Sequence, residues 1–306
     1  ENTMLDICLL GTGGMMPLPG RWLTSALIRY NGKMILIDCG EGTQITLRNV
    51  EWGFKTIEAI CITHYHADHV AGLPGLLLTI GNSGREESVK IIGPKGLKKV
   101  VECLTYISPQ LPFDLELIEV DNCDKKNVDI NGVTIDYLFL DHNITCLGYN
   151  FSIKRPGKFD VDKANKFGVP QRIWSKLQKG EEVELDGKIY KPDMVLGEAR
   201  RGLKVSYCTD TRPTESMKEF VKEADLFICE GMYGTDEKLQ KAIEKKHMMF
   251  SEAAFVALEA NVKEMWLTHF SPSITNPEEF IDSAASIFKN SIIGRDLMKK
   301  TIRFDE

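Results

Sequence analysis

Three histidines and an aspartate stand within six residues, directly after a short apolar run that is typical of a buried strand. The run covers residues 57–62, and the motif that follows reads Thr63-His64-Tyr65-His66-Ala67-Asp68-His69. A lone histidine is more often a satisfied core or surface residue than a metal ligand, but few structural demands explain three beside a carboxylate. Imidazole and carboxylate suit zinc, and the motif lacks cysteine, which favours an open catalytic site over a closed structural one. The chain is therefore expected to fold around a metal centre at the end of a strand.

The pattern on either side of this motif predicts a layered α/β fold. Apolar, β-rich runs separated by glycine-containing turns alternate with helical patterns, as in folds that pack helices on sheets. The predicted strands cover residues 4–10, 24–30, 34–38, 57–62, 89–92, 115–120, 133–140, 148–154, 203–208, 226–229 and 264–268. The predicted helices begin near residue 41 and cover residues 70–80, 95–106, 237–245, 251–260 and 277–288.

Residues 155–201 interrupt this alternation with glycine, proline and charged residues. Eight basic residues and two acidic ones lie between positions 154 and 179, which gives this stretch a charge of +6 and leaves −12 for the remainder of a chain whose net charge is −6. The basic residues are Lys154, Arg155, Lys158, Lys163, Lys166, Arg172, Lys176 and Lys179. Such a stretch is typical either of a solvated face or of an element that grips phosphate groups. We expect one domain over residues 1–306, with a basic insertion at about 154–201.

Composition indicates a compact, soluble protein. Of the 306 residues, 43% are hydrophobic and 27% are charged, which is ordinary globular usage. No apolar run approaches the roughly 20 residues of a membrane span, and the start has no signal pattern. The eight cysteines are scattered without a C-x-x-C pair, which predicts a reducing, cytoplasmic location.

Further candidate ligands follow other predicted strands. His142, Asp210 and His269 each come shortly after a strand, and His247 begins a helix. Because strand ends at one edge of an α/β sheet converge on a crevice, we expect these side chains to meet the histidine motif. An aspartate at a strand end often only caps a turn, so each residue alone could equally be structural. Together they supply enough donors for two metal ions.

These residues belong to a wider set of motifs that resembles the metallo-β-lactamase superfamily, and within it the ribonuclease Z group of tRNA 3′-processing endonucleases. The resemblance spans essentially the whole chain. Besides the histidine motif it rests on Gly11-Thr12-Gly13, Asp38-Cys39-Gly40-Glu41-Gly42-Thr43-Gln44, Gly72-Leu73-Pro74-Gly75, Gly148-Tyr149, Asp210-Thr211-Arg212-Pro213, Glu230, His247 and Thr268-His269-Phe270-Ser271. It implies a four-layer αββα sandwich with a protruding arm.

The resemblance also implies the roles of the site residues. One zinc would bind His64, His66 and His142, a second would bind Asp68, His69 and His269, and Asp210 would bridge them, with manganese or iron as alternative metals. Two such ions can activate water and stabilise the charge that develops in an in-line displacement. Asp68 would also act as the base, and His247, held by Glu230, would protonate the departing ribose oxygen.

The implied substrate is precursor tRNA, cut to remove its 3′ trailer. The basic insertion would be an arm that binds tRNA, and the family implies a homodimer. We place substrate contacts at Arg21, Ser271 and six basic residues of the insertion, namely Lys154, Arg155, Lys158, Arg172, Lys176 and Lys179. The sequence departs from the family around the substrate: Pro17-Leu18-Pro19-Gly20-Arg21-Trp22 replaces the usual Pro-x-Lys-x-Arg-Asn loop, and no Arg-Tyr pair follows His269. These departures bear on substrate choice more than on catalysis.

Three other functions fit the same motifs. A general phosphodiesterase could use the same metals on small esters or other RNA, but it would have no need of a distant basic arm. A lactone, thioester or β-lactam hydrolase would direct the nucleophile at a carbonyl group. A non-catalytic module, stabilised by zinc, fits least well because every ligand position is filled.

Overall fold

The structure is a computed structural model that describes residues 4–108, 110–121 and 127–304. The chain divides into two compact units, one made of Glu1–Ser152 with Lys204–Asp305, the other of Ile153–Leu203. We call the first the main unit and the second the inserted unit. Cys123 lies outside the described residues.

The first sheet of the main unit has seven strands and begins with antiparallel pairs. Its order is β16 (Lys299–Arg303), β1 (Met4–Gly11), β2 (Ser25–Tyr30), β3 (Lys33–Ile37), β4 (Ile57–Cys61), β5 (Val89–Pro94) and β6 (Leu115–Val120). From β3 to β6 the neighbours are parallel. Asn31 and Gly32 join β2 to β3 with positive φ angles of 49° and 74°, which is the two-residue turn that such a hairpin favours.

The second sheet also has seven strands, with the same division into antiparallel and parallel parts. Its order is β15 (Ser291–Ile293), β14 (Met265–Thr268), β13 (Leu226–Glu230), β12 (Arg200–Cys208), β9 (Cys146–Arg155), β8 (Val133–Leu140) and β7 (Val128–Ile130). Strands β12 to β15 are parallel. Another Asn-Gly turn, at Asn131 and Gly132, joins β7 to β8.

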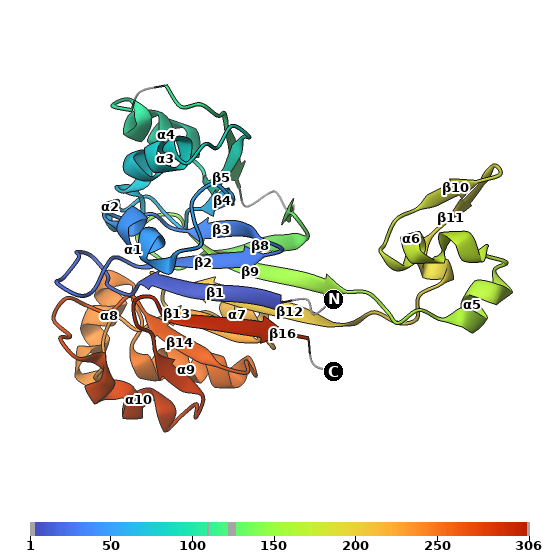
Figure 1. Cartoon of the computed structure of the whole chain (residues 1–306). Helices are drawn as coiled ribbons and strands as arrows, with labels where there is room; N and C mark the ends of the chain where they lie inside the picture. Colours follow the sequence, from blue (N-terminus) through green and yellow to red (C-terminus); the bar gives the residue numbers. More distant parts are fainter. Residues whose placement is uncertain (1–3, 109, 122–126, 305–306) are drawn as a thin grey trace. The chain divides into compact units, whose positions relative to one another are not determined.

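Helices cover the outer face of each sheet, so the main unit has four layers (Figure 1). The first sheet packs against α1 (Thr43–Val50), α3 (Leu73–Asn82) and α4 (Leu97–Thr105), and the second against α7 (Glu215–Val221), α9 (Phe250–Glu259) and α10 (Ile281–Ala285). Strand β1 has apolar residues on both faces, as a strand inside such layers requires. Cys8 and Leu10 pack in the core beneath the helices, and Ile7 and Leu9 on the opposite face of the sheet are equally buried. This is the predicted α/β fold with its αββα layers.

The inserted unit has a small core of its own. It contains α5 (Val161–Lys166), α6 (Trp174–Gln178) and a hairpin of β10 (Val183–Leu185) and β11 (Lys188–Tyr190), with short 3₁₀ turns at Gln171–Ile173 and Pro192–Met194. Ala164, Ile173, Leu177 and Val195 are buried together in it. These apolar residues are separated by many charged residues. Their periodicity was therefore too weak to predict the helices and strands of the inserted unit.

Two predicted helices are wrong in extent. The helix expected at residues 70–80 is two separate helices, α2 (Ala67–Val70) and α3. The chain breaks between them because the Gly72 amide donates to the Cys39 carbonyl oxygen at 3.0 Å and Pro74 has no amide hydrogen to continue the helix. The helix expected at 277–288 is a 3₁₀ turn, Pro277–Phe280, followed by α10, which ends at Ala285. The sequence prediction also missed α7 and the short strands β7, β15 and β16.

Candidate metal centre

Several residues of the centre come directly after strands that run parallel to a neighbouring strand. Asp38 follows β3, His64 follows β4 within three residues, Asp210 follows β12 and His269 follows β14. Asp38, Asp210 and His269 have left-handed backbones, with φ angles of 57°, 55° and 57°. Aspartate and histidine tolerate this conformation better than most residues, and it turns the chain sharply at the strand end. The side chains of both sheets thereby converge on one place.

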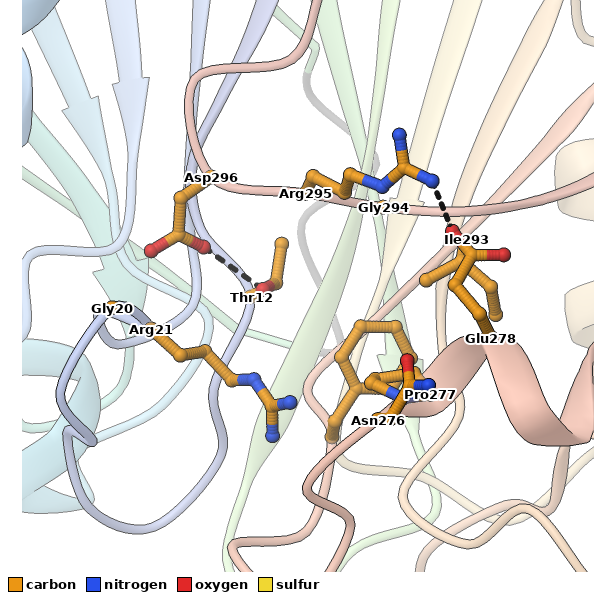
Figure 2. A pocket seen from close by; sticks show the side chains of 11 residues that line it. Thr12, Gly20, Arg21, Asn276, Pro277, Glu278, Ile293, Gly294, Arg295 and Asp296 are labelled. Atoms are coloured by element: carbon orange, nitrogen blue, oxygen red, sulfur yellow. Dashed lines mark hydrogen bonds and ion pairs between the residues drawn. The ribbon is translucent and has the colours of Figure 1, made fainter.

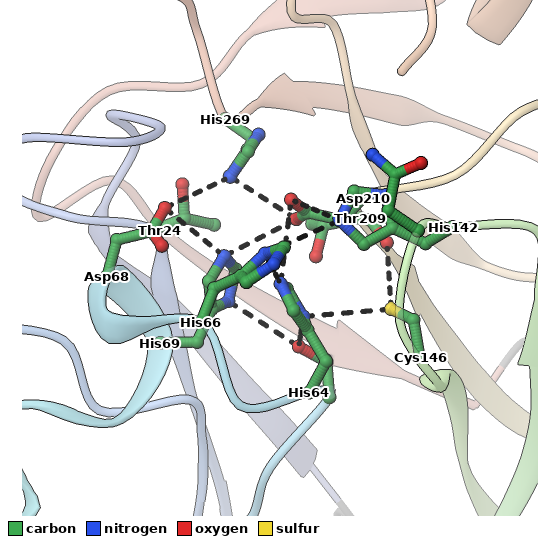
Figure 3. A network of polar contacts seen from close by, with 12 residues as sticks. Thr24, His64, His66, Asp68, His69, His142, Cys146, Thr209, Asp210 and His269 are labelled. Carbon is green, nitrogen blue, oxygen red and sulfur yellow. Dashed lines mark hydrogen bonds and ion pairs between the residues drawn. The ribbon is translucent and has the colours of Figure 1, made fainter. Parts of the chain in front are cut away.

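The first group of donors consists of His64, His66 and His142 with Asp210 (Figure 3). His64 Nε2 lies 2.9 Å from His66 Nδ1, and His142 Nε2 lies 3.5 Å from the same atom. Asp210 Oδ2 is 3.8 Å from Nε2 of both His64 and His142. Burial lowers the pKa of His64 and of His142, so both rings are neutral and can donate a lone pair.

The second group consists of Asp68, His69 and His269, again with Asp210. His69 Nε2 and His269 Nε2 lie 3.5 and 3.8 Å from Asp68 Oδ2. Asp210 Oδ1 lies 3.4 Å from His69 Nε2 and 3.2 Å from His269 Nε2. One Asp210 oxygen therefore faces each group, as a bridging ligand requires.

Both groups fit metal ions, because their donor atoms have a suitable spacing and several of them have no hydrogen-bond partner. Two ligands that bind a tetrahedral zinc ion at its usual distance are roughly 3.3 Å apart, close to the separations observed here. Among the described residues, His69 Nε2, Asp210 Oδ1 and both ring nitrogens of His269 are buried without a hydrogen-bond partner. Buried polar atoms are rarely left in this state unless a ligand satisfies them.

Asp38 supports the centre from behind, a role that the sequence analysis missed because it used Asp38 only within a family motif. This fully buried carboxylate accepts hydrogen bonds from the Thr63 amide at 2.7 Å and the Thr63 hydroxyl at 2.8 Å, and lies 2.7 Å from His69 Nδ1. His142 is held likewise, with Nδ1 3.2 Å from the Lys246 carbonyl oxygen. Such contacts fix the orientation of ligating rings. An aspartate at the end of a predicted strand, two residues before Gly40, was the available signal.

The loop after β1 also touches the centre. The Met15 amide donates to Asp68 Oδ2 at 2.9 Å, and Met15 has a positive φ of 68°. This conformation is strained for a bulky residue and is found mostly where function demands it. The neighbouring Gly14 lies so close to His269 that a Cβ would be 2.8 Å from its Cε1. The loop therefore restrains two residues of the second group.

His247 stands beside both groups and is paired with Glu230. Its ring packs 5.3 Å from that of His142 and 5.6 Å from that of His269, centre to centre. Its Nδ1 lies 3.0 Å from Glu230 Oε2, and the buried Glu230 also accepts from the Thr211 amide at 2.5 Å. Burial alone would lower the pKa of His247, but the Glu230 carboxylate raises it to about 9. The structure thus brings together the pair predicted as acid and support, although Asp210, His247 and His269 also form a third possible ligand set.

A pocket of about 380 Å³ opens onto the donors. Its lining includes Asp68, His247 and Ser271, and also three residues that the sequence analysis did not single out: Tyr233, Lys241 and Lys245. Substrate reaching the metals would meet these side chains.

Arg21 lies in a different pocket (Figure 2), lined also by Thr12 and Asp296. Its guanidinium already donates to the carbonyl oxygens of Ile274 and Thr275, at 2.7 and 3.0 Å. Arg21 thus ties the loop at residues 17–22 to the segment after His269. The structure does not bring it to the metal ligands.

The six predicted basic contacts of the insertion, from Lys154 to Lys179, all lie in the inserted unit. All are exposed except Arg155, which is half-buried. The hairpin that follows them is acidic, with Glu181, Glu182, Glu184 and Asp186 around β10. Arg172 lies 3.4 Å from Asp186, a surface pair that is worth little.

None of the described helices combines the length and apolar character needed to cross a membrane. The seven described cysteines are free thiols, and six of them are buried.

Comparison with known proteins agrees with the fold and the site. The ribonuclease Z of Clostridium acetobutylicum is 55% identical over 307 residues, covering 99% of both chains, and that of Clostridium kluyveri is 56% identical over 303 residues, covering 99% of this chain and 100% of the relative. A family model described as Anti-Pycsar protein Apyc1 matches residues 5–106. The metallo-β-lactamase fold protein YhfI from Bacillus subtilis superposes with a TM-score of 0.71 at 19% identity, over 98% of this chain and 99% of the other. Human tRNase Z, short form, superposes with a TM-score of 0.67 at 23% identity, over 96% and 98%.

The likeness to solved structures shows the metallo-β-lactamase fold. The donor groups and the full-length relatives together define a metal-dependent hydrolase with this fold. The full-length identity to curated relatives narrows this class further. The chain belongs to the ribonuclease Z family.

Proposed function

We propose that this protein is a zinc-dependent endoribonuclease that hydrolyses a phosphodiester at the 3′ end of precursor tRNA and so removes the 3′ trailer. The observation that carries the proposal is identity above 50% over nearly the whole chain to relatives named ribonuclease Z. The donor set supports it, because both ligand groups are complete.

The donors support zinc in particular. Imidazole nitrogens and carboxylate oxygens, without thiolates, suit zinc, although manganese and iron accept similar ligands. His64, His66 and His142 would hold one ion, Asp68, His69 and His269 the other, and Asp210 both. When bound, two such ions supply Lewis acidity to the phosphate group and make water a nucleophile at neutral pH.

The protein's own groups move the protons. Burial would raise the pKa of Asp68, but the neighbouring His269 and His69 hold it well below its usual range, so the carboxylate stays ionised and can orient the attacking water. His247, protonated beside Glu230, would donate its proton to the ribose oxygen as the phosphorus–oxygen bond breaks. Removing Glu230 would leave His247 without its support.

The inserted unit would bind tRNA through the six basic residues predicted as contacts, from Lys154 to Lys179, which adds affinity without sequence specificity. We further propose a cytoplasmic homodimer in which the inserted unit of one subunit serves the metal centre of the other. Mixing two inactive variants would test the dimer: subunits lacking the inserted unit and subunits carrying Asp68→Ala should regain cleavage together.

The decisive experiment is cleavage of a 3′-extended precursor tRNA by the purified, zinc-loaded protein, with bound metal counted. We expect a single cut near the discriminator base, two metal ions per subunit, and loss of cleavage in Asp68→Ala. If the protein binds two metals and hydrolyses a simple diester such as bis(p-nitrophenyl) phosphate but leaves the tRNA intact, a general phosphodiesterase replaces this proposal.

A further inference from the structure

We propose that Lys241 and Lys245 form a phosphate subsite for the nucleotide on the 5′ side of the bond that is cut. The inference rests on the proposed function, because it takes RNA as the substrate and His247 as the group that protonates the departing ribose oxygen. It concerns one wall of the pocket beside the metal ligands.

Both lysines belong to α8 (Leu239–Lys245) and are four residues apart, so they lie on the same face of the helix. They line the same pocket of about 380 Å³ as Asp68, Asp210 and His269. In Figure 1, α8 lies at the same end of the sheets as α2, which carries Asp68.

The two ammonium groups are available to an anion. Lys241 Nζ lies 5.5 Å from the centre of the Tyr233 ring, and no carboxylate in the described part of the chain forms a salt bridge with Lys241. Lys245 pairs with Glu244 at 2.8 Å, but both side chains are more than half exposed, so water screens the pair. The carboxylates that line the pocket, Asp68 and Asp210, are proposed metal ligands. The wall formed by α8 is thus positive.

The position of His247 gives the subsite its direction. His247 follows the end of α8 by two residues, and Glu230 occupies its Nδ1, which leaves Nε2 for the substrate. The oxygen that it protonates belongs to the nucleotide upstream of the cut. The next phosphate of that nucleotide, on its 5′ side, then lies toward the same wall. A small diester has no such phosphate, so the subsite favours polynucleotides.

The test combines protein variants that lack the lysines with RNA strands that lack the charge of one phosphate. A short single-stranded oligoribonucleotide is used to inhibit the hydrolysis of bis(p-nitrophenyl) phosphate by the zinc-loaded protein. In one version a neutral methylphosphonate replaces the phosphate 5′ to the scissile one, and in another it replaces the phosphate on the 3′ side. The proteins are wild type, Lys241→Ala/Lys245→Ala, Lys241→Arg/Lys245→Arg, and Lys98→Ala/Lys99→Ala, which removes equal charge from exposed positions on α4.

In wild type and in the Lys98/Lys99 control, loss of the 5′ phosphate charge should weaken inhibition roughly tenfold, as expected for loss of charge-assisted contacts. In Lys241→Ala/Lys245→Ala the unmodified strand should bind that much more weakly, and the 5′ replacement should change nothing further. The arginine variant should resemble wild type.

An equal penalty for the 5′ replacement in wild type and in the alanine variant would overturn the subsite. If inhibition is weakened by the 3′ replacement instead of the 5′ replacement, the lysines contact the phosphate on the 3′ side, and the proposed placement on the 5′ side is wrong. Cleavage of precursor tRNA by wild type is scored separately, so failure of the proposed function is seen there and not in these inhibition constants.

Discussion

At the residue scale, the metal centre depends on a glycine that leaves room for a metal ligand. Gly14 lies against His269, and any larger residue at this position would occupy the space of the His269 ring. A Cβ there would lie 2.9 Å from His269 Nδ1 and 3.0 Å from Met232 Cε, and both belong to packed, buried residues. The φ of Gly14 is not positive, so the backbone itself does not require glycine.

Gly14→Ala should therefore displace His269 while the fold survives. We expect weaker retention of the second metal ion and hydrolysis reduced on the order of a hundredfold, the usual effect of misplacing a catalytic group by about 1 Å. Metal content after dialysis and turnover of a simple diester would measure this. Gly197→Ala is the control, because a Cβ there meets its nearest atom at an ordinary 3.5 Å. Full metal content in Gly14→Ala would contradict the argument.

The Glu230 and His247 pair predicts a pH dependence. Because the pKa of His247 is raised to about 9, the proton is present below that pH and is lost above it. Glu230→Gln should move the descending limb of kcat/KM to lower pH, toward the ordinary histidine pKa of about 6.5. His247→Ala should lack that limb and lose roughly a hundredfold or more in rate. A limb unchanged in Glu230→Gln would mean that another group supplies the proton.

At the scale of elements, one buried arginine joins the loop after α3 to strand β4 and to the segment before it. Arg85, in the loop between α3 and β5, donates to the Lys55 and Ser88 carbonyl oxygens at 3.0 and 2.7 Å. It also donates to Glu58 of β4 at 3.0 Å. Burial alone would raise the pKa of Glu58, but hydrogen bonds from Arg85 and Lys33 bring it down to about 2.

Glu58→Gln should destabilise the main unit by about 2 kcal/mol at pH 7, because a charge-assisted hydrogen bond to a buried group is lost. A carboxylate whose folded pKa is depressed adds stability above its unfolded pKa of about 4.3, and this is lost as pH falls toward about 2. Urea unfolding of the metal-free protein at pH 7 and pH 3 should thus show a difference from wild type that shrinks in acid. Glu87→Gln removes a mostly exposed carboxylate beside the same arginine and should change little. A difference independent of pH would exclude this linkage.

At the scale of the whole molecule, the inserted unit lies in the chain between two strands that are neighbours in the second sheet. Strands β9 and β12 are adjacent in the second sheet, and Ser206 of β12 donates to Asn150 of β9 at 2.5 Å. The inserted unit has its own buried cluster. The main unit should therefore fold without it.

Replacing residues 156–199 by Asn-Gly, which favours a two-residue hairpin, should leave both metal ions and turnover of a small diester in place. Cleavage of precursor tRNA should fall by about a hundredfold or more at physiological salt, because four of the six proposed phosphate contacts, Lys158, Arg172, Lys176 and Lys179, are removed. The cleavage that remains in this variant should depend less steeply on salt concentration than cleavage by wild type. Undiminished tRNA cleavage would remove the inserted unit from substrate binding.

The sequence by itself determined the class of fold and the composition of the centre. Apolar strand runs, glycine-containing turns and the motif from His64 to His69 are local signals, because each reflects the conformation of a few consecutive residues. Strand-end positions made His142, Asp210 and His269 candidates from distant parts of the chain, and the family resemblance assigned them as ligands.

Only the tertiary structure decided which donor atoms face one another. That Asp210 turns one oxygen to each group, that Asp38 holds His69, and that Lys241 and Lys245 share the pocket all depend on the packing of two sheets. The same holds for Arg21, which binds backbone carbonyls rather than the metal pocket. Such contacts join residues far apart in the chain, and their geometry is set by helix and sheet packing that no local pattern encodes.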